Sequence, residues 1–334
     1  MVKPLLQVYQ NLLIGLHYRV LLLCTIIRIG LIYYLNYERD PCLIGFLHAT
    51  HYNGGIGNVA FEILSFLSLS EYYNMQPVIL DSATQQSLRN FSVFAPNIGK
   101  LIPNNTRICS KPVQVLAGHK ECCLFMPEKL IPKVALSFHA SLNVSFHYLQ
   151  SHRYFLKNPK LSPHSILQGS DFVKNLTTTL FKNPIMKEDF HACVHVRRGD
   201  YLTSGLHHAS TSEDTVKIIK FLRNAYPNAR ILAFGNDNEW LTSLVSGLDV
   251  DVAQFKILNP PNVDWEFSRQ YCDVVALTAP TSTYGWWMAF LARGKVVYYK
   301  EIEKKLEGME SELIPNDYFL PYWTPITKTM LKSY

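Results

Sequence analysis

The chain has 334 residues, of which 48% are hydrophobic, 17% charged and 13% aromatic. At about 100–200 residues per domain, this length suggests two domains. The low charge and high aromatic content exclude an intrinsically disordered chain. The net charge is +6, but there is no long run of lysine and arginine, and aromatic residues do not alternate with basic ones. The sequence therefore does not indicate a nucleic-acid-binding protein.

The first predicted element is a long apolar stretch from Leu12 to Leu35. A helix that spans a bilayer needs about 20 apolar residues, so we expect a signal-anchor over residues 12–35, after a cytoplasmic tail over residues 1–11. Arg28 opposes this interpretation, because a charge near the centre of a span costs on the order of 3 kcal/mol. The alternative is an amphipathic or packed helix. No small-residue cleavage site clearly follows, which disfavours a removed signal peptide.

Acceptor sequences for N-glycosylation occur only beyond this stretch. They begin at Asn90, Asn104, Asn143 and Asn175. Each alone is weak evidence, since Asn-x-Ser/Thr arises easily by chance. Together with the predicted anchor, they favour a single-pass type II protein of the Golgi membrane with a lumenal body.

The chain has seven cysteines, and Cys24 falls within the predicted anchor. In an oxidising lumen, Cys109 could pair with Cys122 or Cys123 and close a short loop. Cys193 lies in an apolar run and is expected to be a buried thiol. Neither CxxC pairs nor metal-ligand spacings occur, so no structural metal is expected.

Residues 42–185 are expected to form a first α/β domain. A strand over 43–48 is followed by a glycine-rich turn, a helix over 59–73 and a strand over 77–81. This order favours a parallel sheet. Residues from about 85 to 185 give no clear periodicity, and no element is assigned there.

Residues 186–328 are expected to form a second α/β domain. The predicted strands cover 191–196, 229–234, 272–277 and 295–299, and the predicted helices cover 211–225, 239–246 and 284–292. Regular alternation of strand and helix is typical of a doubly wound α/β fold.

Three polar clusters follow predicted strands of this second half. They are Arg197–Tyr201, Gly235–Asn238 and Pro280–Thr283. In open α/β sheets, ligands bind beyond the carboxyl ends of the strands. We therefore expect the three clusters to converge on one crevice.

The first cluster contains two adjacent arginines, Arg197 and Arg198. Neighbouring side chains of a strand point to opposite faces, so one arginine is expected to face a ligand while the other braces the fold. A guanidinium group suits a diphosphate, because it makes two parallel charge-assisted hydrogen bonds. The alternative is a structural ion pair with Asp200.

The other clusters have both a structural and a functional interpretation. Ser282 and Thr283 can cap the next helix, whose free N–H groups can also bind an anion. Asp237 is either a turn residue or a carboxylate that contacts a base or ribose. Trp286 and Trp287 follow a helix start and are expected in a helix core rather than on a sugar-stacking surface.

These clusters match a known family. The chain resembles the α-1,2-fucosyltransferases of glycosyltransferase family 11, whose motif His-x-Arg-Arg-Gly-Asp-Tyr is His195–Tyr201 here. Three further blocks, Gly54–Asn58, Phe234–Trp240 and Ser282–Phe290, occur in the family's order. The N-terminal block departs from the pattern, because Val59-Ala60-Phe61 replaces the usual Gln-Met-Phe. This departure bears on acceptor-side contacts more than on donor binding.

The resemblance implies a GT-B-like fold with two Rossmann-like halves. It also implies inverting transfer of fucose from GDP-fucose, usually to the 2-hydroxyl of a galactose-containing glycan, with no metal or other cofactor. Arg197 would hold the β-phosphate and stabilise the leaving GDP, and Asp200 would help to shape that catalytic site. The donor-binding residues implied are His195, Arg197, Arg198, Asp237, Ser282, Thr283, Gly55, Gly57 and Asn58. His195 is interpreted as support for Arg197 rather than as a base.

The base that would deprotonate the acceptor stays unassigned, with Glu62, Asp81 and Asp200 as candidates. Asp249-Val-Asp251 imitates a metal-binding Asp-x-Asp pair. It lies near the start of a predicted strand rather than after one, so a solvated loop is favoured. The scattered histidines show no ligand spacing.

Two rival functions remain. The segment from Gly55 to Ala60 imitates the dinucleotide pattern Gly-x-Gly-x-x-Ala, with Asp81 about where a ribose-binding acid would fall, as in an NAD-dependent oxidoreductase. However, six residues separate His48 from Gly55, whereas that turn should begin at the strand end. The second rival, motivated by Val59-Ala60, is a catalytically inactive relative that binds glycans or nucleotide sugars.

Overall fold

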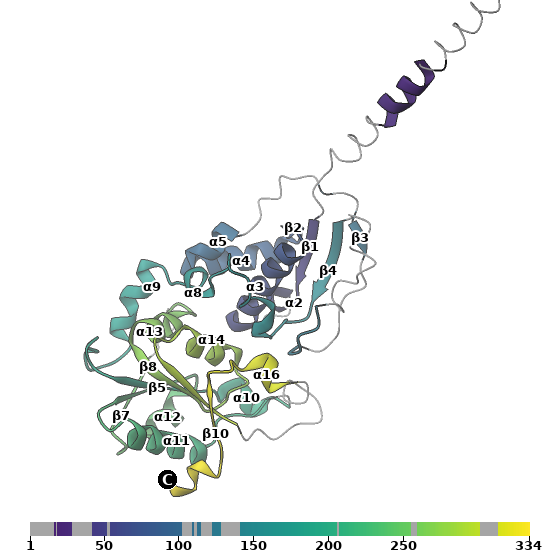
Figure 1. Cartoon of the computed structure of the whole chain (residues 1–334). Helices are drawn as coiled ribbons and strands as arrows, with labels where there is room; N and C mark the ends of the chain where they lie inside the picture. Colours follow the sequence, from purple (N-terminus) through teal and green to yellow (C-terminus); the bar gives the residue numbers. More distant parts are fainter. Residues whose placement is uncertain are drawn as a thin grey trace, which may run out of the picture.

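The computed structural model describes residues 17, 19–28, 42–51, 54–101, 109, 112–114, 122–127, 141–205, 207–254, 259–300 and 313–334. Residues 19–28 form an exposed helix that lies away from the body of the molecule (Figure 1). Within these described ranges, no helix is long and apolar enough to cross a membrane. The rest of the predicted anchor lies outside the described residues, so the anchor stays a prediction.

The N-terminal half is built on a four-stranded parallel sheet in the order β2-β1-β4-β3. Its strands are β1 (Cys42–Leu47), β2 (Gln76–Val78), β3 (Pro112–Gln114) and β4 (Ser141–Phe146). Its helices are α2 (His48–His51), α3 (Ile56–Tyr72), α4 (Ser82–Phe94) and α5 (Pro96–Leu101). The predicted strand–turn–helix–strand opening is confirmed, with α3 connecting β1 to β2.

Short helical turns lead from this sheet to the second half. They are η1 (His152–Tyr154), α8 (Pro163–Ile166), α9 (Asp171–Leu176) and η2 (Thr177–Thr179). Ser162 and Ser170 accept backbone hydrogen bonds at the starts of α8 and α9. This stretch of the sequence has no clear periodicity, because each of these helices is too short to show one.

The C-terminal half is built on a six-stranded parallel sheet in the order β10-β9-β8-β5-β6-β7. Its strands are β5 (His191–Val196), β6 (Arg230–Gly235), β7 (Val250–Val252), β8 (Cys272–Leu277), β9 (Lys295–Tyr299) and β10 (Thr324–Ile326). The strand order reverses between β5 and β8, which makes this the topological switch point where ligands bind in such sheets. The predicted doubly wound sheet is confirmed.

Helices cover both faces of this sheet (Figure 1). They are α10 (Gly199–Thr203), α11 (Ser212–Ala225), α12 (Asn238–Leu244), α13 (Val263–Tyr271), α14 (Thr283–Leu291), α16 (Pro315–Tyr318) and η3 (Met330–Ser333). Alternation along β5 serves both faces: Val194 belongs to the core beneath α11, whereas Cys193 belongs to the core beneath α13 and α14.

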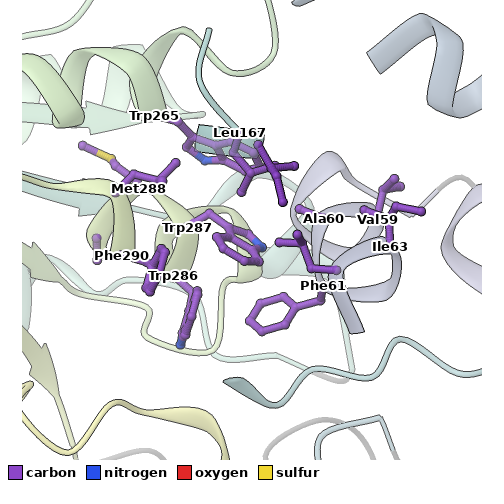
Figure 2. Packing of buried hydrophobic residues seen from close by; sticks show 14 of the residues in the cluster. Val59, Ala60, Phe61, Ile63, Leu167, Trp265, Trp286, Trp287, Met288 and Phe290 are labelled. Carbon is purple, nitrogen blue, oxygen red and sulfur yellow. The ribbon is translucent and has the colours of Figure 1, made fainter. Parts of the chain in front are cut away.

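The two halves share one hydrophobic core, which lies between α3 and α14 (Figure 2). The ring of Phe61 lies 4.7 Å from that of Trp286 and 4.9 Å from that of Trp287, measured between centroids. Both tryptophans are fully buried, so their prediction as helix core is confirmed. Val59 and Ala60 are buried in the same core. The departure from the family pattern at 59–61 is therefore a change of packing, not of a side chain facing a cleft.

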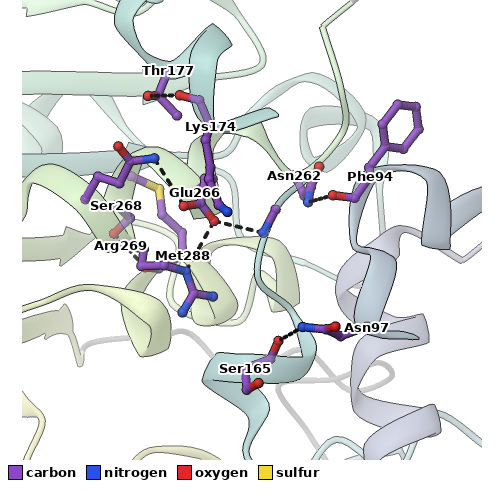
Figure 3. A network of polar contacts seen from close by, with 12 residues as sticks. Phe94, Asn97, Ser165, Lys174, Thr177, Asn262, Glu266, Ser268, Arg269 and Met288 are labelled. Carbon is purple, nitrogen blue, oxygen red and sulfur yellow. Dashed lines mark hydrogen bonds and ion pairs between the residues drawn. The ribbon is translucent and has the colours of Figure 1, made fainter. Parts of the chain in front are cut away.

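A buried carboxylate on α13 makes a second, polar seam between the halves (Figure 3). Glu266 accepts a hydrogen bond of 2.9 Å from the Gly169 backbone N–H and pairs with Arg269 at 3.3 Å. One turn earlier, the Asn262 side chain donates to the Phe94 carbonyl. These bonds fix α13 against the segment that precedes α9 and against the last residue of α4.

Three disulfides correct the expectations drawn from cysteine spacing. Cys109 pairs with Cys42, 67 residues away, and the neighbours Cys122 and Cys123 pair with each other. Cys193 is not a free thiol, because it pairs with Cys272 on the adjacent strand β8. Both long-range bonds join positions that are distant in the chain and that the fold brings together, which spacing along the chain cannot reveal.

Candidate functional site

The ends of β5 and β8 are tied together by hydroxyl groups. The Thr278 hydroxyl donates to the His195 carbonyl at 2.9 Å and lies 2.6 Å from the Ser210 hydroxyl. The backbone N–H of Arg197 donates to the same Ser210 hydroxyl at 3.0 Å. This network fixes the direction in which the chain leaves β5, and with it the position of Arg197.

Two cavities open at this switch point. The first, about 430 Å³, lies within the C-terminal half and is lined by residues that include Asn236, Asn238 and Asp264. The second, about 480 Å³, lies between the halves and is lined by residues that include Asn58, His147 and Thr283. Arg197 and Tyr284 line both cavities, so they stand at the junction of the two.

Arg197 is held so that part of its guanidinium group is still available. Its Nη2 donates to Asp200 Oδ2 at 2.8 Å, and the group lies over the Tyr201 ring. Its Nε is buried and has no hydrogen-bond partner among the described residues. Asp200 thus orients the cation while a donor remains for a ligand.

Arg198 braces the fold, as the strand alternation predicted for one of the two arginines. Its Nε donates to Asp237 Oδ2 at 3.2 Å, its Nη1 donates to the Ser210 carbonyl, and its guanidinium lies 4.0 Å from the Trp240 ring centroid. The other oxygen of Asp237 accepts from the Trp240 backbone N–H. Both oxygens of Asp237 are thus engaged, and its neighbours Asn236 and Asn238 line the first cavity instead.

The turn that follows these arginines, at the start of α10, requires glycine. Gly199 has φ +25°, and a Cβ there would lie 2.4 Å from the Asn236 side-chain nitrogen. That same Asn236 side chain accepts from the Arg198 backbone N–H at 2.9 Å. The glycine of the Arg-Arg-Gly-Asp sequence is therefore required because the chain here passes close to Asn236, in the loop after β6.

His195 is a buried, neutral imidazole. Burial, followed by the charge of Arg197, lowers the pKa of His195 to about 3. An imidazole with that pKa cannot take up a proton near neutral pH. This agrees with its interpretation as a support for Arg197 rather than a base.

Asp264 and Tyr284 are site residues that the sequence did not single out. Burial raises the pKa of Asp264 to about 7, although a hydrogen bond from Tyr284 favours the ionised form. Asp264 Oδ1 has no hydrogen-bond partner among the described residues, and it lines the first cavity. Because α13 was not predicted, no sequence signal pointed to this carboxyl.

The glycine-rich motif at the start of α3 packs against the start of α14. A Cβ on Gly57 would lie 2.7 Å from the backbone of Thr283 and of Tyr284. The Thr283 hydroxyl donates to Asn58 Oδ1 at 2.6 Å, and Ser282 Oγ accepts from the Gly285 backbone N–H. Close helix contact explains the glycine, which removes the main support for a dinucleotide-binding turn. Gly55, Gly57 and Asn58 nevertheless line the second cavity.

The opposite wall of the second cavity comes from the N-terminal half. Tyr148 and Leu149, after β4, have φ of 63° and 47°. Buried Glu62 holds this turn: its Oε1 accepts from the Tyr148 N–H at 2.7 Å and its Oε2 from the Ala49 N–H at 2.9 Å. Burial raises the pKa of Glu62 to about 8, against backbone N–H groups that lower it. Glu62 is thus a scaffold for two strand ends.

The remaining predicted acids and sequons have clear positions. Asp81 Oδ2 caps α4 through the Thr84 N–H and lies 2.8 Å from His51 Nε2. The two acids of the Asp-x-Asp sequence each pair with an arginine, Asp249 with Arg223 and Asp251 with Arg230. Asn90, Asn143 and Asn175 are exposed, and Asn104 lies outside the described residues, so glycosylation stays a prediction.

The chain is similar in sequence to known glycosyltransferases. The family described as Glycosyl transferase family 11 matches residues 47–327. A galactoside 2-alpha-L-fucosyltransferase from Caenorhabditis elegans is 27% identical, over 86% of this chain and 77% of that protein. An alpha-1,2-colitosyltransferase from Escherichia coli is 24% identical, over 71% of this chain and 85% of that protein. A crystal structure of POFUT1 with GDP-fucose is 8% identical and covers 78% of this chain and 98% of that chain, with a TM-score of 0.41. The chain belongs to glycosyl transferase family 11 and is a glycosyltransferase.

Proposed function

We propose that this glycosyltransferase moves L-fucose from GDP-fucose, with inversion, to a galactoside hydroxyl, specifically the 2-hydroxyl. The names of its Caenorhabditis elegans relatives support the sugar and the linkage. The structural observation that carries the proposal is the position of Arg197 between two cavities. A sugar nucleotide has its diphosphate between the nucleoside and the sugar, so a cation at this junction meets the diphosphate.

The first cavity is assigned to the nucleoside. Guanine presents two adjacent donors, N1–H and the 2-amino group, and the unpartnered Oδ1 of an ionised Asp264 can accept from this edge while Tyr284 donates to the same carboxyl group. Adenine has no such pair of donors on its Watson–Crick edge. Asp264 therefore supports a guanosine donor over an adenosine one.

The diphosphate is assigned to Arg197 and to the start of α14. As the bond from the sugar to the phosphate breaks, negative charge grows on the departing GDP. A fixed cation at that place stabilises the transition state. Removal of one such donor typically costs about 3–4 kcal/mol. The N-terminus of α14 adds the partial positive charge of its free N–H groups. With these two sources of charge we propose that the transfer uses no metal.

The overall arrangement proposed is GT-B-like, with the donor on the C-terminal half and the acceptor in the cleft between the halves. We also propose a Golgi membrane location with a lumenal catalytic body. The apolar stretch at residues 12–35 and the four sequons support it. That location predicts that the full chain resists extraction without detergent. It also predicts that the catalytic body is protected from added protease in sealed vesicles.

The catalytic proposal is tested with GDP-fucose, a panel of galactosides, and the variants Arg197→Ala and Arg197→Lys. Arg197→Ala is expected to lower kcat by on the order of 100-fold or more, and Arg197→Lys to recover part of it, because a point charge replaces a bidentate fork. Near-normal turnover in Arg197→Ala would remove that residue from its role. If the wild-type protein moves fucose to none of the galactosides, the proposed function is wrong.

A further inference from the structure

We infer that His147 is the general base that takes the proton from the acceptor hydroxyl. This inference rests on the proposed function and names the one catalytic group that the sequence left unassigned. His147 follows β4 and lines the second cavity, together with Arg197 and Asp200 from the other half.

The chemistry of inversion requires a base on the wall opposite the leaving group. The acceptor oxygen must approach the sugar carbon from the side opposite the departing diphosphate, and the base must stand behind that oxygen. Arg197 and the start of α14 are on the C-terminal half, so the base belongs on the N-terminal half. The described lining residues of that half are Gly55, Ile56, Gly57, Asn58, Cys122, His147, Tyr148 and Gln150. Among these, His147 is the histidine, the residue type that most often serves as a general base.

The carboxylates considered from the sequence are all engaged elsewhere. Glu62 is buried and accepts backbone hydrogen bonds from both Ala49 and Tyr148. Asp81 caps α4 and contacts His51. Asp200 pairs with Arg197 on the donor wall. His207 also lines the cavity, but it stacks on Tyr201, 4.4 Å between centroids, on the donor side.

The position of His147 is fixed by its surroundings. The next residue, Tyr148, has a left-handed backbone held by Glu62, and the Leu149 N–H donates to the His147 carbonyl at 2.8 Å. The His147 ring meets that of His48 edge-on at 4.5 Å and that of Tyr148 at 4.7 Å. Such packing limits the ring to a few orientations toward the cleft.

The charged and titratable groups around His147 come from both halves. From α2 it meets His48, whose pKa is lowered by burial first and then by the charges of His147 and His51. A positive charge on His147 therefore opposes protonation of its neighbour His48. On the opposite side of the cavity, the charged and titratable lining residues of the C-terminal half are Arg197, Asp200, Tyr201, His207 and Tyr284. The positive charge that His147 gains with the proton is offset by the negative charge that develops on GDP.

The transfer forms one bond, breaks one bond and moves one proton. The acceptor oxygen forms a bond to the anomeric carbon of fucose as the bond from that carbon to the β-phosphate oxygen breaks. The bonding electron pair leaves with GDP, which Arg197 stabilises. The hydroxyl proton passes to an imidazole nitrogen of His147 and is later released to solvent.

The test uses His147→Gln and His147→Ala in the full chain, with His164→Gln as the matched control. His164 is an exposed histidine on α8, packed beside Phe290 and outside the cleft. We expect kcat for transfer to a galactoside to fall on the order of 100-fold in both His147 variants. GDP affinity is expected to stay within about threefold of wild type, because the donor site is on the other half. His164→Gln is expected to match wild type in both measurements.

The pH profile separates a base from a residue that only shapes the cleft. The rise of kcat/KM with pH on the acidic side should disappear in His147→Gln, and added imidazole should restore part of the activity of His147→Ala. An unchanged kcat and profile would overturn the inference. So would a loss of GDP binding parallel to the loss of transfer, since that marks a structural role. If wild-type protein does not transfer fucose, the proposed function fails first, and this inference with it.

Discussion

Replacing Asp264 with asparagine is expected to stabilise the unliganded protein at pH 8 while weakening its binding of GDP. Asp264 is 5% exposed, and burial raises its pKa to about 7 from an ordinary value of 3.8. A carboxyl whose pKa is higher in the folded state than in the unfolded one resists ionisation in the fold. The free energy of unfolding is therefore greatest below about pH 4, as far as this group is concerned, and falls as the pH rises to about 7.

The size of the effect follows from that difference in pKa. At about 1.4 kcal/mol per pKa unit, the ionised Asp264 costs the folded protein about 4 kcal/mol at pH 8. Asparagine removes the charge, but it leaves a buried amide that is incompletely bonded, at a cost of about 1–3 kcal/mol. A net gain of about 1–3 kcal/mol at pH 8 is thus expected, whereas at pH 4, where the folded Asp264 carries no charge to remove, the amide cost leaves a net loss of about 1–3 kcal/mol. GDP binding should weaken by about 10- to 100-fold, because a charge-assisted bond to guanine is lost.

Calorimetric melting at pH 4 and pH 8 measures the first effect, and titration calorimetry with GDP measures the second. ADP serves as a control, because it carries the same diphosphate and should lose little affinity in the variant. A variant that melts below wild type at pH 8 would contradict the assigned cost of ionisation. Equal GDP affinities for wild type and variant would remove guanine from the contacts of Asp264.

Two further changes test the packing that positions the site. Gly57→Ala should destabilise the protein by about 1–3 kcal/mol and lower kcat, since the added Cβ meets the backbone of α14 at 2.7 Å; Gly55→Ala, where nothing lies within 4 Å, should leave the melting temperature unchanged. Replacing both Cys193 and Cys272 by serine should lower the free energy of unfolding by about 2–4 kcal/mol in chemical denaturation. Cys24→Ser, at the exposed free cysteine, should have no effect, and an equal loss there would contradict the disulfide assignment.

The meeting of the polar clusters at the strand ends could be predicted because each cluster follows an element that has a clear local sequence pattern. Strand β5, the capped helix α11 and strand β8 each carry their own pattern, and the strand-end rule then places Arg197 and Thr283 at one crevice. Strand alternation predicted that one of the two arginines would brace the fold, whereas the choice of Arg197 as the one that faces a ligand came from the family resemblance. What the pattern could not supply was the partner of Arg198, because Trp240 and Asp237 reach it only through the β6 loop.

Helix α13 escaped prediction for a physical reason. Seven of its nine residues are buried, including Asp264 and Glu266, so it has no polar face against which an apolar stripe would stand out. Buried carboxyls in a short segment look like a solvated loop in the sequence. Their partners, Tyr284 and Gly169, lie 20 and 97 residues from them in the chain. The first cavity, which Asp264 lines, was missed in the sequence for the same reason.

The N-terminal wall of the second cavity could not be predicted because it is assembled from distant segments. His147 follows β4, which pairs with β1 about a hundred residues earlier, and Cys122 is held beside the same turn because its carbonyl accepts a hydrogen bond of 2.8 Å from the Gln150 N–H. The sequence shows His147 as one histidine among twelve, without ligand spacing. Only the pairing of β1 with β4 and the shared core of α3 and α14 bring it opposite Arg197.

The unpartnered polar atoms of the fold give an independent argument for a ligand at the switch point. Most buried polar atoms in native proteins are hydrogen-bonded, and each exception costs about 1–3 kcal/mol. In the described part of the chain, four such atoms belong to residues that line the first cavity: His195 Nδ1, Arg197 Nε, Asn238 Oδ1 and Asp264 Oδ1. Arg197 offers a donor, whereas Asn238 and Asp264 offer acceptors, as a nucleotide with an anionic diphosphate and a base rich in N–H groups requires. The fold leaves these atoms unsatisfied where a guanosine diphosphate sugar would complete them.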